Sequence, residues 1–300
     1  MIRPPYLKKN DQVAVVAPAS FIEKDVLTAA IRCMENWGLK VIPGEYVFTQ
    51  YHQFAGTDAQ RAADLQTAVN NPEIKAIICA RGGYGCGRVI DAVDFLPLTA
   101  HPKWLVGFSD ITSFHARLNR LNMLTIHGTM PINFPPDGAD NESTNSLKDA
   151  LFGKLKSHKM PSHELNKKGA ARAVLVGGNL SLIAHLCGTK DSLNTIGRIL
   201  FIEELGEYLY NIDRLMTQLY RSGTLASLAG LIVGGFTKLK DYETPFGKTA
   251  YEIILDYVSD LNIPVAFDFP AGHREPNLAL YFGQKALLIV TGEETIVYFS

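Results

Sequence analysis

The sequence has no long hydrophobic run, no excess of charge of either sign and little cysteine. No apolar stretch approaches the roughly 20 residues that a membrane-spanning helix needs, and the short apolar run after the N-terminus lacks a signal-peptide core. With 29 basic and 30 acidic side chains, the chain has no basic stripe that would bind a nucleic-acid backbone. We therefore expect neither a membrane nor a nucleic acid as a partner.

Metal-binding and disulfide patterns are also missing. The four cysteines are scattered through 300 residues without a C-x-x-C pair, which favours reduced, packed thiols and a cytoplasmic protein over a disulfide framework. The eight histidines form no H-E-x-x-H pair and have no close partner in the sequence. We expect no metal and no cofactor.

What the first 130 residues do contain is an alternation of apolar runs with helical patterns. The runs "QVAVVAPAS", "IKAIIC", "WLVGF" and "LTIH" predict strands. Between them, "KDVLTAAIRCMENWGL", "TDAQRAADLQTAVNN", "RVIDAVDFL" and "ITSFHARLNRLNM" predict helices; Gly38 closes the first, and a capping box of Thr57 and Gln60 opens the second. This rhythm predicts a parallel sheet covered by helices, with ligands at the carboxyl ends of the strands.

The composition divides the chain into two halves. Residues 136–167 are polar and contain Pro, Gly and Lys around one short helical pattern, which is typical of a connection. We expect an α/β fold with an N-terminal, doubly wound, mostly parallel sheet domain over 1–135, a linker over 136–167 and a C-terminal α/β domain over 168–300. The last segment, "ALLIVTGEETIVYF", predicts two strands joined by a Gly-Glu turn.

The glycine-rich segment "RGGYGCGR" has three interpretations. A dinucleotide fingerprint that starts at Gly83 would need a glycine where Arg88 stands, and a P-loop would need Lys after Gly87. A phosphate cradle is therefore disfavoured. The other two interpretations are a strand-to-helix turn that needs positive φ and a turn whose exposed amides stabilise an oxyanion.

Ser109, in "KWLVGFSDIT", also allows two interpretations. Ser or Asp before a helix is the preferred N-cap, so a structural role is the simpler one. Alternatively, Gly107 permits a sharp turn that would present Ser109 as a nucleophile, with the positive end of the next helix aimed at it. The G-x-S-x-G form of a nucleophile elbow fails at Ile111.

A serine nucleophile needs a base, and the second half of the chain contains candidates. The strand "ILFIEEL" places Glu203 and Glu204 side by side, and because successive strand side chains face opposite ways, only one can enter a shared pocket. His273 follows a glycine in the turn-rich segment "FPAGHREPN". Taken singly, these residues also fit a solvated carboxylate pair and a surface histidine.

Eight segments in order resemble the LD-carboxypeptidase family: "VAPAS", "FAGTDAQRAADL", "ARGGYGCGR", "GFSD", "HGTM", "VGGNLSLI", "FIEELGEYLYNIDRLMTQL" and "AGHREPNLAL". They span residues 13 to 285. The resemblance implies a metal-independent serine peptidase with a catalytic triad of Ser109, His273 and Glu203 at the junction of the two domains. It also implies an oxyanion hole made by the backbone amides of Gly83 and Asp110, with Gly82 nearly as good a choice as Gly83.

The implied reaction is removal of a terminal D-alanine from a cell-wall tetrapeptide through an acyl-enzyme, in peptidoglycan recycling. Arg81 and Arg274 are the candidates for binding the terminal carboxylate of this small peptide substrate. Asn179 in "GGNL" is expected to cap the helix that follows it. The resemblance further implies a homodimer.

Two alternatives remain at this point. Relatives that resemble microcin-immunity hydrolases open aminoacyl-nucleotides and carry aromatic residues before the catalytic glutamate, whereas "TKDSLNTIGR" contains none. A non-catalytic protein could use the same crevice to bind a small ligand.

Overall fold

The computed structural model describes residues 1–299, which form two compact units. The first unit consists of Met1–Leu155 together with Leu278–Tyr281. The second consists of Lys156–Asn277 together with the described residues from Phe282 onward. The first passage from one unit to the other, between Leu155 and Lys156, lies inside the segment expected as a linker, and the chain returns to the first unit at Leu278–Tyr281. Within residues 1–299, no helix combines the length and apolar character required to cross a bilayer.

The first unit contains a six-stranded sheet with the order β11-β5-β4-β3-β1-β2. The strands from β2 to β5 are parallel neighbours, as the alternating sequence pattern predicts. Their bounds are β1 (Gln12–Val16), β2 (Lys40–Pro43), β3 (Ile74–Cys79), β4 (Trp104–Gly107), β5 (Thr125–His127) and β11 (Leu280–Phe282). The strand order reverses between β1 and β3, where open α/β sheets bind their ligands.

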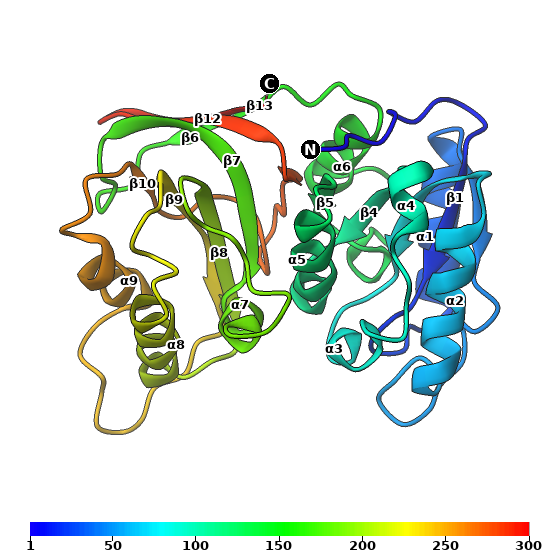
Figure 1. Ribbon diagram of the computed structural model, residues 1–300, viewed down its shortest axis with the longest axis horizontal. Coiled ribbons are helices and arrows are strands. Elements are labelled where there is room, and N and C mark those ends of the chain that lie inside the picture. The colour runs from blue at the N-terminus through cyan, green and yellow to red at the C-terminus, as the bar shows by residue number, and fades with distance from the viewer. Residues whose placement is uncertain (300) are drawn as a thin grey trace. The chain divides into compact units, whose positions relative to one another are not determined.

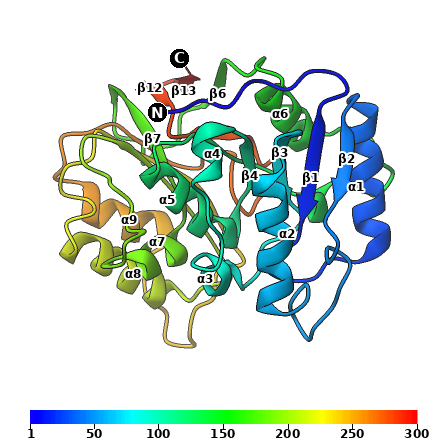
Figure 2. The same ribbon diagram turned by 45° about the vertical axis from the view of Figure 1, so that its right-hand side comes forward.

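Helices cover both faces of this sheet. Figure 2 shows α1 and α2 on opposite sides of β1 and β2, which makes the unit doubly wound. The helices are α1 (Lys24–Asn36), α2 (Asp58–Asn70), α3 (Cys86–Val89), α4 (Pro97–Ala100), α5 (Thr112–Arg120) and α6 (Glu142–Leu151), with 3-10 turns η1 (Ser109–Ile111) and η2 (Pro131–Asn133).

Local signals set the helix ends where the sequence predicted them. The Thr57 hydroxyl accepts the amide of Gln60, and Oε1 of the Gln60 side chain accepts the amide of Thr57, so α2 opens with the expected capping box. Helix α1 ends at Asn36, two residues before Gly38, whose φ of +89° favours glycine.

The prediction of a helix over "RVIDAVDFL" is mostly wrong, because only the short helix α3 (Cys86–Val89) forms there. Asp94 accepts the amide of Leu96 at 2.9 Å, a local bond that competes with a helix. The Gln66 side chain also accepts the Asp94 amide at 2.7 Å.

The strand β2, which the sequence pattern did not predict, lies at the sheet edge and is too exposed to show an apolar run.

A buried lysine closes the carboxyl end of α2. Lys103 is 1% exposed, and its ammonium group donates to the carbonyl oxygens of Ala68, Val69 and Asn71 at 2.5–2.8 Å. Positive charge at this end also favours the helix dipole. We expect Lys103→Met to lower the free energy of unfolding by about 2–4 kcal/mol, because buried carbonyls lose their donor.

Denaturant unfolding would measure this effect, with Lys154→Met as the matched control. Lys154 is exposed, and the donor to the three carbonyls of the helix end is Lys103, so replacement of Lys154 should change stability by less than about 0.5 kcal/mol. Equal stability of both variants would contradict a structural role for Lys103.

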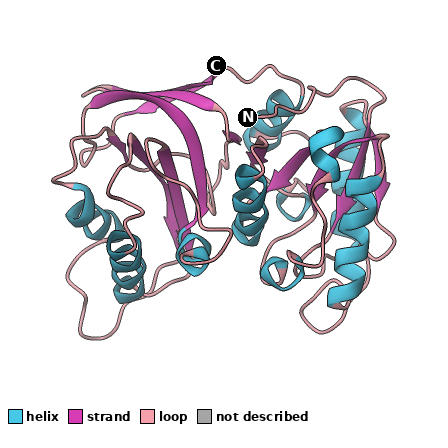
Figure 3. Cartoon of the chain, viewed as in Figure 1, coloured by secondary structure: helices cyan, strands magenta, loops and turns pink. Residues whose placement is uncertain are grey.

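The second unit is built on a seven-stranded mixed sheet with the order β10-β9-β8-β7-β12-β13-β6, drawn in magenta in Figure 3. Strands β7 to β10 are parallel, and β12, β13 and β6 continue the sheet in antiparallel fashion. The bounds are β6 (Ser157–Pro161), β7 (Gly169–Asn179), β8 (Ile199–Leu205), β9 (Gly230–Thr237), β10 (Val265–Ala266), β12 (Lys285–Val290) and β13 (Glu294–Phe299). The pair β12 and β13 confirms the two strands predicted at the end of the chain.

Three helices pack on the parallel strands through a shared apolar core. They are α7 (Leu180–Leu186), α8 (Leu209–Arg221) and α9 (Ala250–Val258), and Figure 1 shows them grouped on one side of β8 and β9. Together the two units confirm the predicted fold class of a parallel-sheet domain followed by an α/β domain.

Candidate active site

Ser109 lies on a strained turn at the carboxyl end of β4. The four residues of β4 are buried, the chain stays extended at Phe108, and Ser109 then adopts a φ of +63°. A non-glycine residue in this left-handed region costs about 1–3 kcal/mol. The helix α5 begins three residues later, and its N-cap, Ile111, makes no side-chain bond. The interpretation of Ser109 as a simple helix cap is therefore wrong.

Gly107 makes this turn possible. A Cβ atom at Gly107 would stand 2.7 Å from a side-chain carbon of Ile111. Any residue larger than glycine at position 107 would therefore collide with Ile111. The Gly107 carbonyl accepts a bond from Nε2 of His115 at 2.9 Å, and Nδ1 of His115 lies 2.9 Å from the Thr125 hydroxyl. Burial lowers the pKa of His115 to about 4, so this histidine is neutral and structural.

The glycine-rich turn after β3 faces Ser109. A Cβ atom at Gly82 would lie 2.9 Å from Cβ of Ser109, 3.2 Å from its hydroxyl oxygen and 3.4 Å from the amide nitrogen of Asp110. Gly83 has a φ of +101° and faces the Ser20 hydroxyl in the loop after β1. Gly82 thus lies beside both the serine and the Asp110 amide. The oxyanion hole at Gly82 or Gly83 and Asp110 stays a prediction.

Two buried charged side chains hold this turn in place. The Asp110 carboxylate accepts the Cys86 amide at 2.7 Å, and burial raises the pKa of Asp110. Arg61 is 1% exposed and donates to the carbonyl oxygens of Pro18 and Gly85 at 2.7 and 3.2 Å. Because these bonds connect the turn to the serine and to the end of β1, both side chains act as positioning residues.

Arg61 was not predicted from the sequence. The available signal was the position of this arginine on the buried face of α2, in line with Leu65 and Ala68, where a solvent-exposed charge does not belong. Arg61 pairs with Asp58 and lies 4.7 Å above the ring of Phe54, so its charge is compensated.

In the second unit, Glu203 and His273 form a hydrogen-bonded pair. Glu203 lies near the end of β8 and is fully buried; its Oε2 accepts Nδ1–H of His273 at 2.6 Å and the backbone amide of His273 at 3.0 Å. The donor at Nδ1 leaves the imidazole lone pair on Nε2, the tautomer that a general base needs. Gly272 permits this approach, since a Cβ there would meet Glu203 at 2.6 Å.

Burial and the neighbouring carboxylates act in opposite directions on the pKa of His273. Burial lowers the pKa of His273, but the hydrogen bond and the charge of Glu203, with a smaller contribution from Glu204, outweigh this effect and raise the pKa above its ordinary value. A histidine with a raised pKa is a stronger base once it is neutral.

Glu204 faces the other way, as strand geometry predicts. Its carboxylate accepts Nδ2 of Asn179 at 2.8 Å and the amide of Ser181 at 2.8 Å. Asn179 also accepts the amide of Leu182 at 3.2 Å, which confirms its role as the cap of α7. Only Glu203 of the two carboxylates reaches His273.

The two arginines proposed as carboxylate anchors are already engaged within their own units. Arg81 donates to the Phe21 carbonyl at 3.0 Å, next to the glycine turn. Arg274 forms an ion pair with Asp268 and donates to its carbonyl at 3.1 Å. Their binding of a substrate carboxylate stays a prediction.

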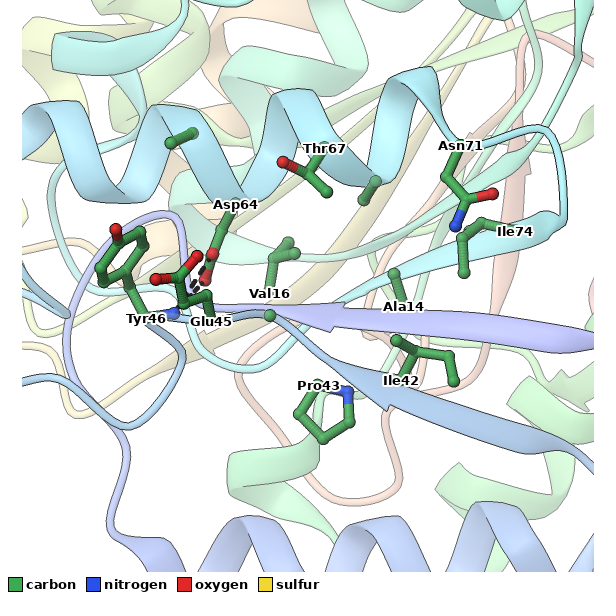
Figure 4. A pocket seen from close by; sticks show the side chains of 13 residues that line it. Ala14, Val16, Ile42, Pro43, Glu45, Tyr46, Asp64, Thr67, Asn71 and Ile74 are labelled. Carbon is green, nitrogen blue, oxygen red and sulfur yellow. Dashed lines mark hydrogen bonds between the residues drawn. The ribbon is translucent and has the colours of Figure 1, made fainter.

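A pocket of about 130 Å³ lies between α2 and the strands β1 and β2, away from every predicted site residue (Figure 4). It is smaller than the roughly 300–1,000 Å³ of typical ligand pockets. Asp64, which lines the pocket, accepts the Tyr46 amide at 3.0 Å and so fixes the turn after β2.

Across residues 1–299, no group of three or more His, Cys, Asp and Glu side chains could hold a metal ion.

The contact between Gly82 and Ser109 leads to a prediction. We expect Gly82→Ala to reduce kcat about 100-fold, because the added methyl group would displace either the serine or the oxyanion turn. Steady-state kinetics would measure the loss, with Gly87→Ala as the control, since no atom lies within 4 Å of a Cβ at Gly87. Full activity of Gly82→Ala would show that the turn takes no part in the reaction.

Comparison with known proteins gives consistent matches. The LD-carboxypeptidase N-terminal domain matches residues 13–128, and the LD-carboxypeptidase C-terminal domain matches residues 172–288. The probable murein peptide carboxypeptidase of Bacillus subtilis is 34% identical, over 98% of this chain and 93% of that protein. The murein tetrapeptide carboxypeptidase of Pseudomonas aeruginosa is 32% identical, over 93% of each chain.

Solved structures share the fold. The muramoyltetrapeptide carboxypeptidase of Oxalobacter formigenes has a TM-score of 0.88 at 28% identity and covers 96% of this chain and 98% of its own. The microcin C7 self immunity protein MccF in complex with aspartyl sulfamoyl adenosine has a TM-score of 0.86 at 20% identity, over 100% of this chain and 99% of its own. The second likeness concerns the fold alone.

Proposed function

The chain belongs to the LD-carboxypeptidase family, and we propose that it removes the terminal D-alanine from murein tetrapeptides as a serine carboxypeptidase. The observation that carries this proposal is the buried Glu203–His273 hydrogen bond of 2.6 Å. A histidine oriented by a fully buried carboxylate through Nδ1 is the base and orienter of a serine triad. Ser109, on the strained turn of the first unit, is the nucleophile in this proposal.

In the proposed mechanism, Oγ of Ser109 bonds to the carbonyl carbon before the terminal D-alanine while its proton passes to Nε2 of His273. The amides of Asp110 and of the glycine turn, at Gly83 or Gly82, stabilise the oxyanion. The peptide bond then breaks, and His273 protonates the departing amine. Water, deprotonated by His273, hydrolyses the acyl-enzyme. This mechanism requires Ser109 of the first unit to come within hydrogen-bonding reach of His273 of the second.

Two other functions are less well supported. Hydrolysis of an aminoacyl-nucleotide would use aromatic stacking before the catalytic glutamate, and the segment 189–198 contains no Trp, Tyr or Phe. A protein that only binds a ligand would not need the serine at a φ of +63° or the tautomer-fixing bond to Glu203.

The experiment that tests the function is release of free D-alanine from L-Ala–γ-D-Glu–meso-diaminopimelate–D-Ala, with a chelator present. The control substrate is the same peptide with a terminal L-alanine. We expect release only from the D-terminated peptide. Release of neither residue, with turnover of an aminoacyl sulfamoyl adenosine, would favour the nucleotide substrate instead.

We also propose a cytoplasmic location and a homodimer. The four cysteines are free thiols, and Cys33, Cys79 and Cys86 are buried, which is consistent with a reducing compartment. Sedimentation velocity would measure the oligomeric state, and fractionation of cells would locate the protein.

A further inference from the structure

The loop that carries His273 is folded tightly on itself. Gly272 has a φ of +95° and donates its amide to Oδ1 of Asn277 at 2.9 Å. The amide of Arg274 donates to the Gly272 carbonyl at 2.8 Å, so His273 is the central residue of a three-residue turn. These bonds shape the loop, and bonds to strand β9 hold it against the sheet of the second unit.

Strand β9 contains a bulge next to this loop. Between two paired positions, β8 has one residue, Glu203, whereas β9 has two, Gly234 and Gly235. The amide of Gly235 donates to the Ala271 carbonyl at 2.9 Å. A Cβ atom at Gly234 would lie 2.7 Å from that carbonyl oxygen, so the loop packs directly on the backbone of the bulge. Bulges of this kind redirect strands and side chains next to functional sites.

Thr237, two residues after the bulge, holds the other end of the turn. Its hydroxyl donates to the His273 carbonyl at 2.7 Å, and its own carbonyl accepts the Gly206 amide at 2.9 Å. Oε2 of Glu203 accepts the His273 amide at 3.0 Å and Nδ1–H at 2.6 Å. The main chain of His273 is therefore bonded on its amide side by β8 and on its carbonyl side by β9.

The strand does not need the hydroxyl of Thr237 in order to form. Valine has nearly the same shape and is also favoured in strands, because both side chains are branched at Cβ. The bond between Thr237 and the Gly206 amide uses the backbone carbonyl and would survive the loss of the hydroxyl. What threonine adds at this position is thus the bond to the His273 carbonyl.

We propose that Thr237 is a positioning residue, whose hydroxyl holds the His273 main chain so that the imidazole ring stays aligned with Glu203. This inference rests on the proposed function and adds a residue to its site. Without the hydroxyl, the peptide group after His273 could turn, and the ring would leave the geometry in which Oε2 of Glu203 accepts both the amide and Nδ1–H. A displacement of about 1 Å in a reacting group can lower a rate about 100-fold.

The first test measures the steady-state kinetics of D-alanine release from the tetrapeptide. We expect Thr237→Val to reduce kcat about tenfold and to leave KM within about twofold of the wild type, because the hydroxyl bonds to the protein rather than to the substrate. Thr237→Ser retains a hydroxyl and should keep kcat within about twofold. The acidic limb of kcat/KM should move to lower pH in Thr237→Val, because burial lowers the pKa of His273 and the bond to Glu203 raises it.

The matched control is Thr195→Val. Thr195 is 5% exposed, and its hydroxyl donates to the Thr224 carbonyl at 2.7 Å, which is the same kind of bond at the same length. Both variants should lose a similar amount of thermal stability, but only Thr237→Val should change kcat. Equal losses of kcat in the two variants would assign the effect to general destabilisation and overturn the inference.

Proton NMR tests the inference without any substrate. The Nδ1 proton of His273 lies in a 2.6 Å bond to a carboxylate, and a proton in so short a bond resonates far downfield. Its loss in Glu203→Gln would assign the resonance. We expect the resonance to shift upfield in Thr237→Val and to stay in place in Thr237→Ser and Thr195→Val.

This spectrum separates the inference from the proposed function. If the wild-type protein released no D-alanine, the proposed function would fail, and an upfield shift in Thr237→Val would still support the alignment of His273 by Thr237. An unchanged resonance in Thr237→Val, or a wild-type kcat for this variant in an active enzyme, would overturn the inference.

Discussion

Replacing Ser109 by alanine is expected to lower kcat for D-alanine release by about 10⁵–10⁶-fold, because no other group on this turn could form the acyl-enzyme. The remaining activity would come from the oxyanion donors and from substrate binding. The control is Ser259→Ala, an exposed serine at the end of α9, which should retain wild-type kinetics. Activity in Ser109→Ala within tenfold of the wild type would remove Ser109 from the mechanism.

A second variant at the same position separates strain from chemistry. Ser109 has a φ of +63°, which glycine adopts without penalty. We therefore expect Ser109→Gly to be inactive and yet about 1 kcal/mol more stable than Ser109→Ala, with thermal unfolding as the measurement. Equal stability of the two variants would mean that the turn carries no strain.

Several features of the site and of the helix ends could be predicted from local sequence patterns. Adjacent carboxylates at a strand end must face opposite ways, so strand geometry predicted that only one of Glu203 and Glu204 enters a shared pocket. The family resemblance then implied that this one is Glu203. The cap of α7 at Asn179 and the capping box of α2 at Thr57 were equally local, since each depends on amides within three residues. Local hydrogen-bond rules therefore predict individual elements well.

Other features depended on contacts between segments that are distant in the sequence. Arg61 reaches Pro18 and Gly85, which lie 43 and 24 residues away, so no local pattern indicates its role. Ser109 was ambiguous for the same reason, because its cap-like sequence context says nothing of the φ that Gly107 and Ile111 impose. The exposed edge strand β2 gave too weak an apolar pattern to be recognised.

Replacing Glu203 by glutamine is the second change with a large expected effect. We expect kcat to fall about 10⁴-fold, because an amide that turns its NH₂ group towards Nδ1 holds His273 in the wrong tautomer. The matched control is Glu204→Gln, whose side chain faces Asn179 and Ser181 instead. This control should retain much more activity than Glu203→Gln.

The pH dependence supplies an independent test of the same pair. A general base must be neutral, so kcat/KM of the wild-type protein should rise with pH through a pKa above the ordinary histidine value of about 6.5. Glu203→Gln removes the hydrogen-bonding charge that raises the pKa of His273 and leaves the opposing effect of burial. The acidic limb of the residual activity should therefore move to lower pH, and a limb that stays in place would contradict the assigned base.

Stability should follow with the opposite dependence on pH. The folded protein holds the His273 proton more tightly than the unfolded chain, because the pKa of His273 is raised in the folded state. This contribution is complete below the unfolded-state pKa of about 6.5 and disappears as the pH rises through the folded-state value. The wild-type protein should thus exceed Glu203→Gln in unfolding free energy by more at pH 6 than at pH 9. Catalysis and the contribution of His273 to the unfolding free energy therefore depend on the same hydrogen bond. They have opposite pH dependences, since the reaction requires a neutral His273 whereas this stabilisation requires the protonated form.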